Sequence, residues 1–324
     1  MNSNSQLLQI APMMNRTDRH FRMLLRYLAP DALLYTEMVV ADAIRYGSSS
    51  RTLGHSSLEN PLIVQFGGSD PETLVIACKK AEKEGFAGIN LNVGCPSSRV
   101  QIGDFGVCVM LKPDLVCRCI EAMISAVDIP ISVKCRLGVD EHDSYEFLSK
   151  FVQRIQGVGV KHFIIHARKA ILSGLTPAQN RTIPPLNYDA VRRIKIDYPD
   201  LQITLNGGLT TTSSVNQALT WADGVMIGRA SYENPLWIHE LDGKLFRNKE
   251  APFDPHNLIK EYMPYMQSQL NIDTPLKHMT RHLLNLFNGQ PGAKSFRRTL
   301  SDEGRLATAG LETLSNALRQ ITAL

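Results

Sequence analysis

Eight short apolar runs, each followed by a polar or glycine-rich segment, constrain the fold of this 324-residue chain most strongly. The runs cover residues 7–10, 32–35, 62–64, 89–93, 131–133, 163–165, 203–205 and 224–227. Apolar runs of this length, bounded by turn residues, are typical of parallel strands that are buried on both faces. Because helical stretches lie between most of them, the pattern predicts an α/β fold of the (β/α)8 TIM-barrel type. A doubly wound open sheet is the alternative.

The pattern changes after Arg229, and we predict a domain boundary at residue 245. Residues 231–245 are expected to form the last barrel helix, and the polar, proline-containing segment 247–255 is expected to be a linker. Helical spacing then predicts helices over 256–270, 275–287, 291–300 and 311–323. The sequence therefore predicts a barrel domain over 1–245 and a C-terminal all-α helical bundle domain over 246–324.

Composition excludes several classes of protein. No stretch approaches the ~18 apolar residues that cross a bilayer, and the first residues do not have the pattern of a secretory signal. The six cysteines form no Cys-x-x-Cys pair, so neither a structural metal nor a disulfide framework is expected. We expect a cytoplasmic protein without membrane partners that acts as a monomer.

Charge is concentrated in one part of the C-terminal region. Residues 274–301 contain no acidic residue and five basic ones, which are Lys277, Arg281, Lys294, Arg297 and Arg298. A local basic face on a chain of net charge +4 indicates a polyanionic partner. A solvated helix face explains the same pattern, and charge alone does not separate the two.

Glycine-bearing segments follow the seventh and eighth runs, and a barrel active site lies at the carboxyl ends of its strands. The segments are Asn206-Gly207-Gly208 and Gly228-Arg229. Glycine lets backbone N–H groups approach an anion closely, and the Arg229 guanidinium is a bidentate donor. The pattern predicts a phosphate-bearing ligand.

Polar residues at the other strand ends indicate what that ligand is. Lys134 in a partly buried mouth needs an anion beside it, and the N1–C2=O edge of a reduced flavin is one. Gln65 can donate to and accept from the flavin ring, and Pro12 and Met13 offer an apolar wall. Cys95 ends an apolar run and precedes a proline, which indicates a thiol aimed at a pocket.

These segments together resemble the tRNA-dihydrouridine synthases, and the bacterial A subfamily most of all. The matching segments are Ala11-Pro12-Met13, Gln65-Phe66-Gly67-Gly68, Asn90-Leu91-Asn92-Val93-Gly94-Cys95-Pro96, Val133-Lys134-Cys135-Arg136, Ile165-His166-Ala167-Arg168-Lys169, Asn206-Gly207-Gly208 and Gly228-Arg229. The resemblance implies a barrel that binds FMN and a helical domain that binds tRNA, with NADPH as the reductant. It also implies hydride transfer to C6 of D-loop uridines, at positions 20 and 20a in this subfamily, with a cysteine that protonates C5.

The resemblance assigns roles to individual residues. Cys95 matches the proton donor, and Asn92 matches a residue beside the target uracil. The residues that match FMN contacts are Pro12, Met13, Met14, Gln65, Lys134, His166, Asn206, Gly207, Gly208, Gly228 and Arg229. The expected tRNA contacts are Arg181, Lys294, Arg297 and Arg298.

Two other functions remain open from the residues alone. A small-molecule FMN-dependent pyrimidine oxidoreductase would have the same barrel mouth, but it gives no reason for the basic helical region. A non-catalytic RNA-binding protein would explain the basic region but not Cys95, Lys134 and the two glycine segments.

Overall fold

Eight parallel strands form one sheet. The computed structural model describes residues 7–47, 52–249 and 253–321. The strands are β1 (Leu7–Ile10), β2 (Leu34–Val40), β3 (Leu62–Gly67), β4 (Gly88–Val93), β5 (Ile131–Arg136), β6 (His162–His166), β7 (Gln202–Asn206) and β8 (Gly224–Ile227). Each of the eight apolar runs overlaps one strand, as the sequence predicts. Residues 36–38, the segment that follows the second run, lie within β2, where the pairing with β3 shifts register between Tyr35 and Met38.

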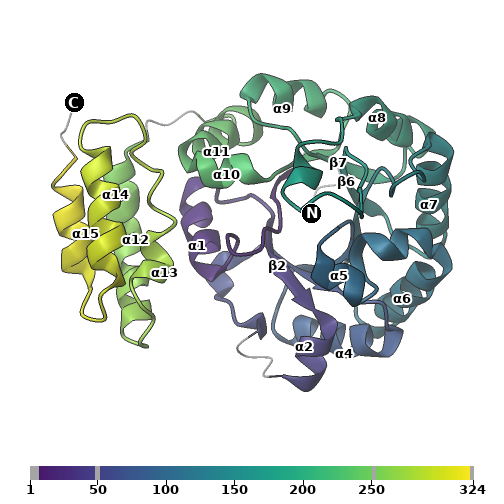
Figure 1. Cartoon of the computed structure of the whole chain (residues 1–324), viewed down its shortest axis with the longest axis horizontal. Coiled ribbons are helices and arrows are strands. Elements are labelled where there is room, and N and C mark those ends of the chain that lie inside the picture. The colour runs from purple at the N-terminus through teal and green to yellow at the C-terminus, as the bar shows by residue number, and fades with distance from the viewer. Residues whose placement is uncertain (1–6, 48–51, 250–252, 322–324) are drawn as a thin grey trace. The chain divides into compact units, whose positions relative to one another are not determined.

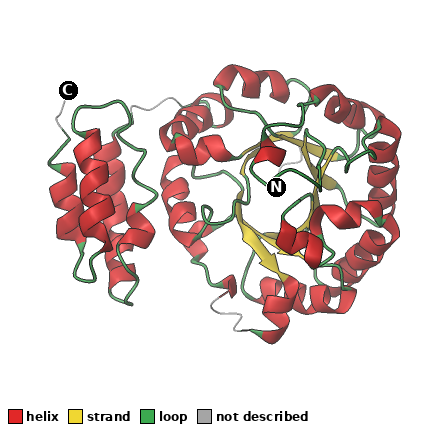
Figure 2. Cartoon of the chain, viewed as in Figure 1, coloured by secondary structure: helices red, strands yellow, loops and turns green. Residues whose placement is uncertain are grey.

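The sheet is closed. Its strand order is β1-β8-β7-β6-β5-β4-β3-β2, which leaves β1 and β2 at the two ends. These ends are joined next to β2, because the Ile10 N–H donates to the Leu33 carbonyl at 3.0 Å and the Leu33 N–H donates to the Leu8 carbonyl at 2.9 Å. Figure 2 shows the resulting ring of strands. The TIM-barrel prediction is therefore confirmed, and the doubly wound open sheet is excluded.

Helices follow the strands around the barrel. They are α2 (Ala41–Tyr46), η1 (Ser57–Glu59), α4 (Pro71–Lys83), α5 (Ser98–Ile102), η2 (Gly106–Leu111), α6 (Pro113–Ala126), α7 (Tyr145–Gly157), η3 (Gln179–Arg181), α8 (Tyr188–Asp197) and α9 (Thr212–Leu219). The helices α4, α6, α7, α8 and α9 lie outside the ring (Figure 1). Capping hydrogen bonds and prolines in the first turn fix where these helices begin. For example, the Asp70 carboxylate accepts from the Thr73 N–H at the start of α4, and Pro71 occupies the first turn.

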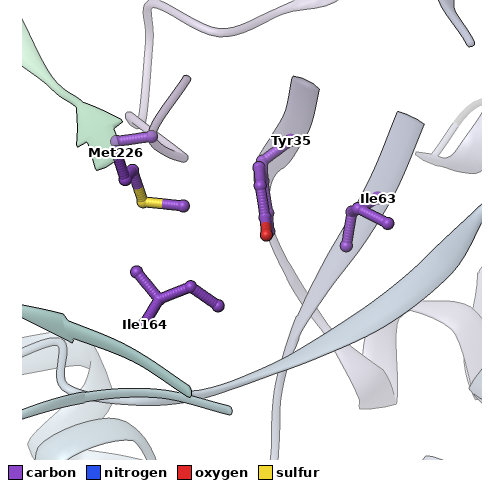
Figure 3. Close-up of a cluster of buried hydrophobic side chains, with 5 residues drawn as sticks. Tyr35, Ile63, Ile164 and Met226 are labelled. Atoms are coloured by element: carbon purple, nitrogen blue, oxygen red, sulfur yellow. The ribbon is translucent and has the colours of Figure 1, made fainter. Parts of the chain in front are cut away.

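The barrel interior contains an apolar cluster formed by Ala11, Tyr35, Ile63, Ile164 and Met226. Figure 3 shows four of these side chains, from strands β2, β3, β6 and β8, turned toward a common centre. The Tyr35 hydroxyl, which is buried with the cluster, donates to Gln9 Oε1 at 2.9 Å. Because this interior is filled by side chains, it is a packed core and not a channel.

The chain divides into two compact units. The first consists of Met1–Asn15 and Ala32–Gly228, and the second of Arg16–Asp31 and Arg229–Leu324. The helices of the second unit are α1 (Arg19–Leu28), α10 (Arg229–Glu233), α11 (Pro235–Leu241), η4 (Asp242–Phe246), α12 (Pro255–Leu270), α13 (Lys277–Thr280), α14 (Ala293–Asp302), η5 (Glu303–Arg305) and α15 (Leu311–Leu318). These units group three helices from before residue 245 with the C-terminal ones, and the boundary at 245 stays a prediction.

A half-buried carboxylate, that of Asp18, anchors α1 within the second unit. Asp18 accepts from the backbone N–H groups of His20 and Phe21 at 3.0 Å each, and it pairs with His282 Nε2 at 3.0 Å and with Arg281. Burial alone would raise the pKa of Asp18, but the bonds from His282 and from the backbone hold that pKa well below its usual range. Arg281, a member of the basic stretch, is therefore partly neutralised.

Three predicted helices differ from the structure. The helix expected over 231–245 is interrupted because Pro235 lacks the N–H that would continue α10 into α11. The helix expected over 275–287 is α-helical only over Lys277–Thr280, and the following turns close by i→i−3 bonds such as His282 N–H to the Met279 carbonyl. Apolar spacing of three to four residues does not distinguish these turns from an α-helix. The last helix, α15, ends at Leu318. Residues 250–252 of the expected linker lie outside the described residues.

Candidate active site

The predicted site residues of the first unit lie at one end of the barrel. Gln65, Asn92, Lys134, His166 and Asn206 lie in the C-terminal halves of five successive strands. The register places Asn92 opposite Lys134 and His166 opposite Asn206. Because all the strands are parallel, their carboxyl ends open on the same mouth. The remaining predicted residues of this unit follow directly in the loops, namely Pro12, Met13 and Met14 after β1, Cys95 after β4, Gly207 and Gly208 after β7, and Gly228 after β8.

The Cys95 thiol lies on a turn that is held from both sides. Asn92 Oδ1 accepts from the backbone N–H groups of Gly94 at 3.1 Å and Cys95 at 2.9 Å. The Cys95 carbonyl in turn accepts from the Val107 N–H at 3.1 Å. Cys95 is partly exposed, and its Sγ lies 3.6 Å from Ser97 Oγ. Cys95 is therefore partly exposed at the mouth while the backbone of its turn is fixed by hydrogen bonds.

Side-chain amides extend from this turn into the barrel. Asn92 Nδ2 donates to Gln65 Oε1 at 2.9 Å, and Gln65 Nε2 donates to Asn90 Oδ1 at 2.8 Å. Asn90 Nδ2 then donates to Ser132 Oγ at 2.9 Å. Neither Asn90 nor Ser132 is among the site residues predicted from the sequence. The available signal was the period of two along a strand, because Asn90 and Ser132 lie two positions before Asn92 and Lys134 and so face the same way.

Two cations in the mouth, Lys134 and Arg136, have no carboxylate partner among the described residues. Lys134 Nζ donates to Asn206 Oδ1 at 3.0 Å, while Arg136 donates to the carbonyls of Gly94 at 2.8 Å and of Lys169 and Asn180 at 3.1 Å. Burial, reinforced by Arg136, lowers the pKa of Lys134 to about 8, and burial lowers that of Arg136 to about 10. Among the described residues neither cation forms an ion pair with an acidic side chain. Such a pair of cations fits an anionic ligand. Arg136 is not among the site residues predicted from the sequence.

The backbone of the glycine segment after β7 packs closely against neighbouring side chains. Gly207 and Gly208 have φ values of 108° and 70°, in the region that favours glycine. A Cβ added to Gly207 would lie 2.6 Å from His166 Cδ2, and one added to Gly208 would lie 2.4 Å from Leu186 Cδ1. Within the described part of the chain, the two glycine N–H groups donate no hydrogen bond. They are therefore available to an anion such as a phosphate.

His166 adds a neutral polar group beside these glycines. Burial and then the nearby Arg136 hold the pKa of His166 well below its usual range, so its imidazole is uncharged at neutral pH. Its ring makes no hydrogen bond to any residue that the structure describes. A neutral imidazole can donate one hydrogen bond to a ligand without adding charge to the site.

The remaining predicted cofactor residues have different surroundings. Met13 packs against the apolar cluster in the barrel, whereas Met14 is exposed and Pro12 is partly exposed. Gly228 follows β8, and a Cβ added to it would lie 3.9 Å from the Ala11 Cβ. Arg229 is exposed at the start of α10 and belongs to the second unit. Its contact with phosphate stays a prediction.

The predicted tRNA contacts lie on two surfaces. Arg181 ends the short helix η3 in the long loop after β6, and it is exposed. The loop is pinned by the neighbouring Asn180, which is buried and hydrogen bonds with both the N–H and the carbonyl of Ile171 at 2.7 and 2.8 Å. Lys294, Arg297 and Arg298 lie on α14 of the second unit.

The basic residues of α14 share the side of the helix that faces away from its core. Ala293, Phe296 and Leu300 are the buried residues of α14, whereas Lys294 and Arg298 are exposed. Arg297 donates to Asn288 Oδ1 at 2.7 Å. Spacings of three and four residues bring the three cations onto one stripe. The stripe is a suitable surface for phosphates, and its contact with tRNA stays a prediction.

The described residues contain neither a membrane-spanning helix nor a cluster of metal ligands. There, no helix is both long and apolar enough to cross a bilayer. No group of three or more His, Cys, Asp or Glu side chains is placed to hold a metal ion in this part of the chain. All six cysteines lie within it, and each is a free thiol.

Comparison with known proteins gives one consistent family. The profile of the dihydrouridine synthase (Dus) family matches residues 9–322. A tRNA-dihydrouridine(20/20a) synthase of Synechocystis sp. is 48% identical over 96% of this chain and 93% of its own length. Proteins of the same name from Xanthomonas axonopodis pv. citri and Escherichia coli K12 are 47% and 45% identical, over 97% and 96% of this chain and 93% and 90% of their own lengths. The chain therefore belongs to the dihydrouridine synthase family of oxidoreductase enzymes.

Proposed function

We propose that this chain is a tRNA-dihydrouridine synthase that reduces the C5=C6 bond of uridines 20 and 20a in the D-loop of tRNA. The observation that carries the proposal is the Cys95 turn, which holds an accessible thiol at a mouth whose two cations have no acidic partner among the described residues. The name shared by three relatives of nearly full coverage supports the choice of substrate and positions.

The mouth has the properties that FMN requires. Lys134 and Arg136 lack an anion, and the N–H groups of Gly207 and Gly208 lack an acceptor among the described residues. We infer that the glycine segment holds the FMN phosphate together with Gly228 and Arg229, and that Lys134, Gln65 and His166 hold the ring. Asn206, Pro12, Met13 and Met14 complete the proposed binding residues. Bound FMN, once reduced by NADPH, supplies the hydride that uracil C6 receives.

Cys95 supplies the second hydrogen. Addition of hydride at C6 leaves negative charge at C5, which must be protonated before the product is stable. The Cys95 thiol is the donor, and the Asn92 bonds to the backbone of the turn fix where that thiol lies. The target base has to leave its stack to reach the site, at a cost of roughly a few kcal/mol. We place Asn92 beside this base.

Binding of tRNA would supply the energy for that extrusion. The stripe of Lys294, Arg297 and Arg298 and the exposed Arg181 are the proposed phosphate contacts. Each lysine or arginine that neutralises a phosphate releases counterions and so favours binding. The proposed substrate also implies that the enzyme works in the cytoplasm, where we propose that it acts as a monomer.

The test uses the purified protein with FMN, NADPH and unmodified tRNA. We expect the protein to bind FMN and the D-loop to gain two hydrogen atoms at each of positions 20 and 20a, mapped by fragment mass spectrometry. Equal reduction of free uridine or UMP would instead support a small-molecule pyrimidine oxidoreductase. Colourless protein that takes up no FMN, or tRNA left unchanged, would contradict the proposed function.

A further inference from the structure

A row of polar side chains crosses three neighbouring strands of the barrel. Gln65 of β3 lies opposite Asn90 of β4, and Asn90 lies opposite Ser132 of β5. All three side chains are buried. Asn92 is two residues beyond Asn90, so it faces the same way, one step nearer the mouth. These four residues form a continuous chain of hydrogen bonds to the Cys95 turn.

The chain of bonds has only one direction. The backbone N–H groups of Gly94 and Cys95 are donors, so the atom of Asn92 that faces them must be its oxygen. Asn92 must then donate through its nitrogen to Gln65, which has to present its oxygen in return. A side-chain amide has one oxygen and one nitrogen, so each orientation determines the next.

The orientations of Asn90 and Ser132 are determined in the same way. Gln65 presents its nitrogen to Asn90, so Asn90 presents its oxygen to Gln65 and its nitrogen to Ser132. The Ser132 hydroxyl accepts this bond and donates its own hydrogen to the Ile89 carbonyl at 3.2 Å. Turning any one amide would place donor against donor in a buried setting, which is costly.

We propose that Asn90 and Ser132 are positioning residues for the reductase site, acting through Gln65 and Asn92 on the Cys95 thiol. Neither residue needs to contact substrate. They fix the Gln65 amide, which leaves its second Nε2 hydrogen for the mouth, and through Asn92 they fix the backbone of the Cys95 turn. This proposal rests on the proposed function for its effect on tRNA reduction. The hydrogen bonds that hold the Cys95 turn, by contrast, involve only residues of this chain.

The alternative is that these side chains only fill the core. The barrel offers a control for that view, because Thr204 Oγ1 accepts from Gln9 Nε2 at 2.8 Å and lies 2.9 Å from His162 Nε2. Thr204 is as buried as Asn90. This second polar group has no hydrogen bond to the Cys95 chain among the described residues. Thr204→Val therefore measures the loss of a buried polar contact alone.

The experiment compares Asn90→Leu, Ser132→Ala, Ser132→Thr and Thr204→Val in the FMN-bound protein. The first readout is the rate at which iodoacetamide alkylates Cys95, followed by peptide mass spectrometry. The second separates flavin reduction by NADPH from tRNA-dependent reoxidation in stopped flow. The third is the free energy of unfolding in urea.

We expect Asn90→Leu and Ser132→Ala to change the alkylation rate several-fold and to slow tRNA-dependent reoxidation on the order of 10- to 100-fold. The conservative Ser132→Thr keeps the hydroxyl and should restore both rates, and Thr204→Val should change neither. Ser132→Ala, the smaller change, decides the matter if Asn90→Leu does not fold.

The inference is overturned if Ser132→Ala and Thr204→Val have the same alkylation and reoxidation rates at similar stability. Failure of the proposed function looks different, because wild-type protein would then leave tRNA unreduced. In that case the alkylation rates alone decide whether the amide chain holds the Cys95 turn.

Discussion

The Lys134 ammonium should destabilise the protein when the mouth holds no anion. Folding lowers the pKa of Lys134 from 10.5 to about 8, first through burial and then through Arg136. A depressed lysine pKa means that the unfolded chain binds the proton more tightly, so the penalty is complete below pH 8. The difference between the two values corresponds to about 3 kcal/mol. The penalty is relieved as pH rises from 8 to 10.5.

Lys134→Met removes the charge and keeps most of the side-chain length. The substitution also removes the hydrogen bond to Asn206 Oδ1, which costs about 1–2 kcal/mol if that oxygen stays unpaired. We therefore expect FMN-free Lys134→Met to be about 1–2 kcal/mol more stable than FMN-free wild type at pH 7. The advantage should shrink above pH 8 and reverse near pH 10.5, where only the missing hydrogen bond remains.

Urea unfolding of the FMN-free proteins at several pH values between 7 and 10.5 measures this effect. Lys150→Met on the exposed face of α7 is the matched control, and its stability difference from wild type should not follow the same pH course. Saturating FMN should stabilise wild type more than Lys134→Met, because the anion then pairs with the charge. A variant that is less stable at pH 7, or a difference that does not vary with pH, would refute the reasoning.

Three further predictions concern the reaction, the cofactor and the substrate. Cys95→Ala should bind FMN and tRNA normally but reduce tRNA on the order of 10²–10⁴-fold more slowly in single-turnover assays; near-normal turnover would exclude the proposed role. Gly207→Ala should lower stability by about 1–3 kcal/mol and weaken FMN binding in titrations, because its φ of 108° and the 2.6 Å approach to His166 leave no place for a methyl group; unchanged affinity would remove the glycine segment from the site. Replacing both Arg297 and Arg298 by alanine should lower the salt slope of tRNA binding by roughly 0.7–0.9 for each phosphate that the variant no longer neutralises, with FMN content unchanged, whereas an unaltered slope would identify a solvated face.

The strands of the barrel were readable from the sequence alone. A parallel strand covered by helices outside and side chains inside is apolar on both faces, so it stands out as a continuous run. The match of residues 7–10 and 224–227 with β1 and β8 follows from this physics. The glycines after β7 and the thiol after β4 were also readable, because their chemistry is specific to a strand end.

The bounds of the helices in the second unit were harder to predict from the sequence. Apolar spacing locates a buried face but does not report which backbone bonds form behind it. Pro235 divides one predicted helix, and i→i−3 bonds replace most of another after Thr280. The pairing of Asp18 with His282 joins residues 264 positions apart in the chain, as their numbers show. No local pattern contains that contact.

The sequence determined which groups the barrel mouth contains, and the tertiary structure decided which of them act together. Asn90 and Ser132 each lie two positions before a predicted site residue, Asn92 and Lys134, but no local pattern in the sequence shows that the two are hydrogen bonded to one another. Pairing brings Asn90 within hydrogen-bond distance of Gln65 and Ser132, which lie 25 and 42 residues away. Strand register, set by the packing of the whole barrel, makes these separate residues into one chain of bonds to Cys95.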